Sequence, residues 1–157
     1  KKKPTGSAYN LWGGCGPTRQ CEIKDIGQRF GNGWRKVFNI YAKLLFALPT
    51  QWYPLSGARE SWQLMRDTDL LQGSAGHALL FSAPALEQAG VHIVMGKTYA
   101  QHLIDKGLVP NDFIWKDAHF AKSTSANVII CPYFDYRQLT NERIDVLVSL
   151  IVGTLDQ

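Results

Sequence analysis

A short segment near the end of the chain combines aromatic, acidic and basic side chains. Residues 132–138 read PYFDYRQ and follow the apolar run 128–131. Aromatic rings can stack on nucleobases, and an arginine beside them can hold a phosphate. A carboxylate in such a loop can act as a general base or orient water. We predict Asp135 as a catalytic residue, and the predicted ligand-binding residues around it are Tyr133, Phe134, Tyr136 and Arg137.

This segment also has a purely structural interpretation. Tyr133 and Phe134 can pack on the core, and Asp135 can pair with Arg137. The sequence leaves both interpretations open.

A second candidate is Gly96-Lys97-Thr98, which lies between an apolar run and a helical pattern. Backbone N–H groups at the start of a helix can bind phosphate. A Walker A loop needs a glycine at the position of Val91, so ATP hydrolysis through this motif is excluded. We predict that Lys97 and Thr98 bind a phosphate; the alternative is a tight turn with Lys97 in solvent.

The segment 12–17, with sequence WGGCGP, could supply a third wall of a cleft. Its three glycines permit positive φ angles, and Pro17 fixes the exit of the turn. Trp12 and Gly14 are therefore candidate ligand-binding residues. The alternative is a structural turn.

Cysteine and histidine spacing argues against a metal or disulfide framework. The three cysteines contain no CxxC pair, and the four histidines do not fall at zinc-ligand spacing with them. We expect no metal and no cofactor. Reduced thiols and the lack of an apolar run near the roughly 18 residues of a membrane span predict a cytoplasmic protein without membrane contact.

The net charge of +4 is concentrated at one end. Residues 1–36 hold eight of the 17 Lys and Arg residues but only two of the 13 Asp and Glu residues. Such a segment can attract phosphate backbones, and the alternative is a solvated tail. DNA or a nucleotide is thus a candidate partner.

The periodicity of apolar residues predicts the elements that position these groups. Residues 34–48 repeat at three- and four-residue steps and predict a helix that ends at Pro49, and a weaker helix is expected over 58–71. Short apolar runs predict buried strands at 78–82, 91–95 and 128–131. Further helices are expected from Gly96 to Lys106 and over 141–152, with Gly153 beyond.

Strands that alternate with amphipathic helices indicate an α/β fold. We predict a single domain over residues 1–157, with a glycine-rich basic segment at 1–33 and an α/β core at 34–157. The core is expected to be a three-layer α/β/α arrangement around a small, mainly parallel sheet.

Three stretches resemble the uracil-DNA glycosylase superfamily: ALLFSAP at 78–84, VHIVMGKTYA at 91–100, and NVIICPYFDYRQL at 127–139 followed by a helix. The similarity covers about residues 78–152. The final strand and its loop resemble the family's minor-groove loop, although that loop usually carries a His-Pro-Ser or Pro-Ser motif.

The resemblance implies a hydrolase of DNA repair that binds DNA or nucleotides and excises a base. It implies base flipping, followed by attack of water on the glycosidic carbon. The family's water-activating Asp or Asn lies in an early Gly-Pro-containing loop, which makes Asn10 the candidate catalytic residue here. The alternative is a non-enzymatic binding or accessory protein on the same fold.

Overall fold

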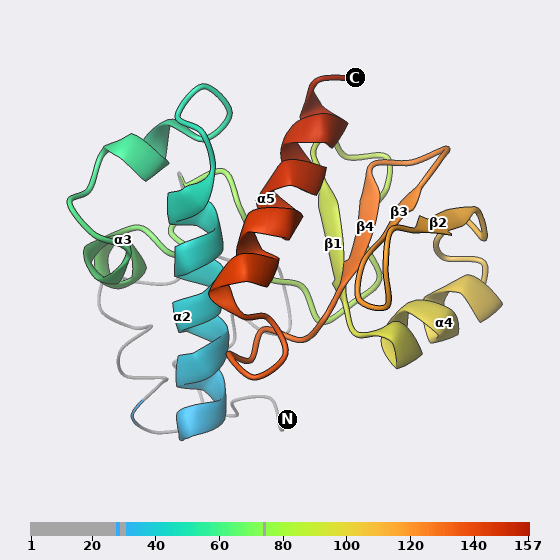
Figure 1. The fold of residues 1–157 in the computed structure, drawn as a ribbon, viewed down its shortest axis with the longest axis horizontal. Helices are drawn as coiled ribbons and strands as arrows, with labels where there is room; N and C mark the ends of the chain where they lie inside the picture. Colours follow the sequence, from blue (N-terminus) through green and yellow to red (C-terminus); the bar gives the residue numbers. More distant parts are fainter. Residues whose placement is uncertain (1–27, 29–30, 74) are drawn as a thin grey trace. The chain divides into compact units, whose positions relative to one another are not determined.

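The computed structural model describes residue 28, residues 31–73 and residues 75–157 (Figure 1). The chain divides into two compact units, Lys1–Phe81 and Ser82–Gln157. Most of the predicted basic segment 1–33 lies outside the described residues. That the whole chain forms one domain stays a prediction.

The main element of the first unit is helix α2, Asn32–Ala47, which confirms the helix predicted from apolar spacing. Leu48 leaves the helix with an extended backbone (ψ 141°), since a residue before proline avoids the helical conformation. Phe38 and Leu44 are each 1% exposed and anchor the buried face. Within its unit, α2 contacts helix α3, Trp62–Thr68, and the 3₁₀ turn η2, Pro54–Gly57.

Helix α3 is shorter than the predicted 58–71. The Ser61 side chain accepts the Leu64 N–H at 3.2 Å, so Ser61 is the N-cap and fixes the start of the helix. At the other end, Leu71 has a positive φ of 60°, which no helix interior contains.

The strand predicted at 78–82 does not form. This stretch has no strand pairing, and the Ala78 carbonyl instead accepts the Tyr41 hydroxyl at 2.7 Å. The apolar residue Phe81 packs edge-on against Trp34, with ring centroids 5.6 Å apart. The apolar run therefore reflects packing on α2, not membership of a sheet.

The second unit is built on a four-stranded sheet with the order β1-β4-β3-β2 (Figure 1). Strands β1 (His92–Met95) and β4 (Val128–Cys131) were predicted, and they pair in parallel. Strands β2 (Phe113–Trp115) and β3 (Ala121–Ser123) were not predicted, and each pairs antiparallel with its neighbours.

The α/β class is confirmed, but the expectation of a mainly parallel sheet is not. One of the three strand pairings is parallel and two are antiparallel. The physical reason lies between α4 and β4, where the chain returns to the sheet as the hairpin β2–β3. A hairpin places its second strand antiparallel to the first, whereas a helical crossover would have kept all strands parallel.

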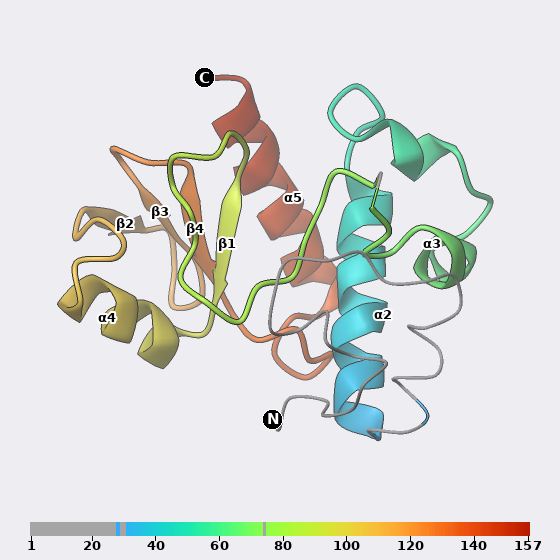
Figure 2. The same ribbon diagram turned by 180° about the vertical axis from the view of Figure 1, so that it is seen from behind.

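Two helices complete this unit. Helix α4, Lys97–Asp105, follows β1 directly and ends before Gly107, as predicted; Figure 2 shows this link from behind. Helix α5, Asn141–Leu155, starts as predicted at its N-cap Thr140 but continues through Gly153. Glycine is permitted inside a helix at a modest cost, so it does not by itself end one.

Strand β4 is buried along its whole length, which makes it the centre of the unit. Val128 and Ile130 belong to a core cluster with Ala100 and Leu103 of α4. Helix α5 also contacts β4. In the part of the chain that the structure describes, no helix is long and apolar enough to cross a membrane.

Candidate functional site

The carboxyl ends of β1 and β4 lie side by side. Met95 pairs with Cys131, and the Gly96 N–H donates to the Cys131 carbonyl at 2.8 Å. The two sequence stretches singled out for chemistry, Gly96-Lys97-Thr98 and residues 132–138, therefore leave the sheet at one edge. This is the edge at which open α/β sheets place their ligands.

Tyr133 lies directly against the backbone of Gly96. A Cβ at position 96 would stand 2.7 Å from Tyr133 Cε2 and 2.8 Å from Cζ. Gly96 also has a φ of +94°, which side chains rarely adopt. Position 96 thus requires glycine for two reasons, and Tyr133, 51% exposed, rests on it while still presenting surface to solvent.

The next residue, Lys97, lies over the ring of Trp115. Its Nζ is 4.6 Å from the ring centroid, within the range of a cation–π interaction. Trp115 belongs to β2 and is 45% exposed. Sequence reasoning missed Trp115, because the three-residue run FIW is too short to show an alternation of exposed and buried residues. We call Gly96, Lys97, Trp115 and Tyr133 the strand-end cluster.

Asp135 shapes the loop that follows β4. Its carboxylate accepts the backbone N–H of Arg137 at 3.0 Å, and its carbonyl accepts the N–H groups of Gln138 and Leu139, both at 2.8 Å. The Asp135 carboxylate thus contacts Arg137 through its backbone N–H, and a pairing of the two side chains stays a prediction. Asp135 as a residue is half-buried, and its carboxylate makes a structural contact within the loop.

The remaining predicted site residues, three in this loop and Thr98 in α4, fall into different environments. Phe134 is 4% exposed, so its ring packs inside the unit and would reach a ligand only if the loop rearranged. Tyr136 is 52% exposed, and the Arg137 guanidinium lies 5.9 Å from its ring. Thr98 is exposed in the first turn of α4. The loop therefore offers Tyr136 and Arg137 to a ligand beside the strand-end cluster.

Helix α5 holds the far end of this loop in place. Arg143 donates to the Gln138 carbonyl at 2.5 Å and to His119 Nε2 at 2.8 Å. A guanidinium can only donate, so His119 accepts this hydrogen bond through Nε2. Asp117 accepts the N–H groups of His119 and Phe120, which lowers the pKa of its carboxyl. The Arg143 contacts join the loop 132–138 to the turn between β2 and β3, and the Asp117 contacts hold that turn. Sequence reasoning missed both sets of contacts.

Two other features limit the chemistry of the site. Burial raises the pKa of the Cys131 thiol, so this cysteine is no nucleophile at neutral pH. Within the described ranges, no group of three or more His, Cys, Asp or Glu side chains could hold a metal ion. The predicted residues Asn10, Trp12 and Gly14 lie outside the described residues.

Residues 1–152 match the model of a protein family, DUF6942, a family of unknown function. The chain belongs to DUF6942. The match covers all four residues of the strand-end cluster and also Asn10, Trp12 and Gly14. No curated protein and no solved structure shows significant similarity to the chain. The similarity to uracil-DNA glycosylases stays a prediction from the sequence, and the chemistry of this DUF6942 chain has to be argued from its geometry.

Proposed function

We propose that this chain binds DNA or a nucleotide through its strand-end cluster. One observation carries the proposal. The exposed ring of Tyr133 rests on Gly96, and the adjacent Lys97 lies on the exposed ring of Trp115. Two exposed aromatic residues thus contact consecutive residues, Gly96 and Lys97, at the carboxyl end of β1.

Nucleic acids and nucleotides match this arrangement chemically. A nucleobase stacks on an aromatic ring, and each such contact is worth about 1–3 kcal/mol. A lysine beside the rings neutralises one phosphate and releases its counterions. Arg137 and Tyr136 extend the same combination of cation and ring along the loop.

The proposal is tested with fluorescence anisotropy on a short labelled DNA, single-stranded and as a duplex, with ATP as competitor, over a range of salt. We expect Tyr133→Ala to weaken binding about 5- to 150-fold, the equivalent of one lost stacking contact. Lys97→Gln and Arg137→Gln should each reduce the slope of log affinity against log salt concentration by about one.

Matched variants separate the site from general effects. Lys106→Gln removes an equal charge from the C-cap of the same helix α4 and should leave binding unchanged. Tyr133→Phe keeps the ring and should retain most of the affinity. No binding by the wild type at low salt, or equal losses in Lys97→Gln and Lys106→Gln, would refute the proposal.

Base excision is a second candidate, favoured by the carboxylate of the half-buried residue Asp135 at the same edge. It rests on the resemblance to uracil-DNA glycosylases, with Asn10 or Asp135 activating water. The test is the formation of abasic sites in duplexes that carry damaged bases. Asp135→Asn should abolish it if Asp135 activates the water, and Asn10→Ala if Asn10 does; binding without any excision by the wild type would favour the accessory protein.

The proposal includes a three-layer arrangement of the second unit. Side chains alternate between the faces of a strand. Val128 and Ile130 share a cluster with α4, so Ile129 and Cys131, both buried, point to the other face. Helix α5, which contacts β4, would cover that face. We further propose a cytoplasmic location, where thiols such as that of Cys131 stay reduced.

A further inference from the structure

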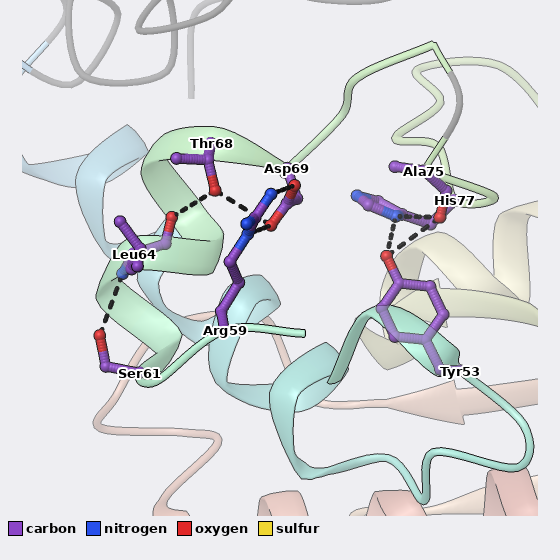
Figure 3. Close-up of polar contacts among 8 residues, drawn as sticks. All are labelled: Tyr53, Arg59, Ser61, Leu64, Thr68, Asp69, Ala75 and His77. Carbon is purple, nitrogen blue, oxygen red and sulfur yellow. Dashed lines mark hydrogen bonds and ion pairs between the residues drawn. The ribbon is translucent and has the colours of Figure 1, made fainter. Parts of the chain in front are cut away.

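His77 in the first unit is held by hydrogen bonds at both ring nitrogens. Nδ1 lies 2.8 Å from the Tyr53 hydroxyl and 3.1 Å from the Ala75 carbonyl (Figure 3). Nε2 accepts the backbone N–H of Leu71 at 2.9 Å. The ring therefore links Leu71 and Ala75 to Tyr53.

These partners determine the protonation state of the imidazole. A backbone N–H can only donate, so Nε2 must be an unprotonated acceptor. The ring proton is then on Nδ1, where the Ala75 carbonyl and the Tyr53 hydroxyl can accept it. Tyr53 in turn donates its own proton to Ala75 at 3.0 Å. His77 is thus neutral, with one defined tautomer.

A protonated His77 cannot make the same contacts. An imidazolium carries a proton on Nε2, which would face the Leu71 N–H at a distance of 2.9 Å. Leu71 is held there at a φ of +60°, a conformation that a leucine adopts only when its surroundings impose it. Loss of the acceptor would remove one contact that holds this backbone.

We propose that His77 is a pH-sensitive latch, which fastens Leu71 and Ala75 to Tyr53 while neutral and releases them when protonated. The released state frees Leu71 and Ala75 from Tyr53 while α2 stays folded. This device is independent of the strand-end cluster and of the function proposed for it.

The groups that face His77 make protonation unfavourable. Tyr41 of α2 and Tyr53 place their rings edge-on to the imidazole, at centroid distances of 5.3 and 5.8 Å. Asp69, just after α3, is the negative charge that acts on His77, but Arg59 binds both of its carboxylate oxygens at 2.7 and 2.9 Å (Figure 3). Burial therefore dominates and lowers the pKa of His77 below its usual 6.5.

The sign of the effect follows from proton linkage. Between pH 6.5 and the lower pKa of the folded protein, the open state binds a proton that the closed state does not. The closed state is therefore fully favoured above pH 6.5. Below it, the population of the open state rises by at most about tenfold per pH unit and levels off at the lower pKa of the closed state.

Amide hydrogen exchange on the ¹⁵N-labelled full chain tests the latch. We expect the protection factor of the Leu71 amide to fall below pH 6.5, by at most about tenfold per pH unit, until the pH reaches the lower pKa of His77. The Leu44 amide of α2, in the same unit, should keep its protection. His77→Gln retains an acceptor for the Leu71 N–H but cannot titrate, so its Leu71 protection should not change with pH. His102→Gln, which removes an exposed histidine of α4, should behave like the wild type.

Three results would overturn the latch. These are equal losses of protection at Leu71 and Leu44, a constant Leu71 protection in the wild type, or an unchanged acid response in His77→Gln. If the His77→Gln chain does not fold, the ¹⁵N shifts of wild-type His77 decide. A proton on Nε2 at neutral pH, or a pKa at or above 6.5, rejects the latch; a proton on Nδ1 with a lower pKa supports it.

Discussion

At the scale of single residues, position 96 illustrates how strongly one site can constrain a residue type. Gly96 must adopt a positive φ, and it must also leave room for the Tyr133 ring. The first demand comes from the turn between β1 and α4, and the second from the loop after β4. The two demands can be separated by mutation, because only the second involves Tyr133.

We expect Gly96→Ala to lower the free energy of unfolding by about 1–3 kcal/mol, because alanine is strained at this φ and displaces the Tyr133 ring. In a Tyr133→Ala background the substitution should cost less, since only the backbone strain remains. Urea denaturation of the four chains of this double-mutant cycle measures the difference. Strictly additive effects would contradict the contact.

At the scale of elements, the sequence predicted those whose apolar pattern is long or continuous. The three- and four-residue steps from Trp34 to Leu45 fit a helical period only. The run VIIC has no period, but its β-branched residues and the following Pro132 favour a short buried strand. Strands β2 and β3 have three residues each, too few to display an alternation. The run at 78–82 misled because periodicity does not distinguish burial against a helix from burial in a sheet.

The candidate site was predictable to a similar extent. Parallel pairing of two apolar strands brings their carboxyl ends together, so Lys97 and Tyr133 were expected near one edge. Trp115 comes from the hairpin that the sequence did not reveal. The burial of Phe134 depends on tertiary packing, which the spacing of aromatic residues does not specify.

The β2–β3 hairpin is fastened at one end by Asp112. Its carboxylate accepts the hydroxyls of Ser123 at 2.7 Å and Thr124 at 2.8 Å. Ser123 in turn accepts the N–H groups of Ser125 and Ala126. These hydrogen bonds favour the ionised carboxylate and hold the pKa of Asp112 well below its usual 3.8.

Acid should therefore weaken this hairpin. A carboxyl whose pKa is lower in the folded state stabilises the fold fully above its unfolded pKa, near 3.8, and this contribution is lost as the pH falls toward the folded value. We expect Asp112→Asn to reduce the pH dependence of stability below pH 4. Urea denaturation of both chains between pH 2 and 5 measures it. Parallel pH profiles would show that Asp112 does not contribute.

At the scale of the whole molecule, the structure has two compact units, whereas the sequence predicts one domain. Phe38, 1% exposed, lies in the core of the first unit, so truncating it measures how much this core contributes to stability. We expect Phe38→Ala to cost about 3–5 kcal/mol in chemical denaturation, the usual range for a buried phenylalanine. Phe46→Ala, at a half-buried position of the same helix, should cost less. A loss below about 1 kcal/mol for Phe38→Ala would mean that its side chain is not in the core.

The burial of Cys131 also provides a way to measure whether the two units unfold together. A thiol reagent can modify Cys131 only after the centre of the second unit opens, since this residue is 1% exposed on strand β4. In a chain that carries Cys15→Ser and Cys21→Ser, the rate at which Cys131 is modified measures how often the centre of the second unit opens. If the two units unfold as one domain, Phe38→Ala must raise the rate of Cys131 modification, although Phe38 belongs to the other unit. An unchanged rate would identify two bodies that open independently.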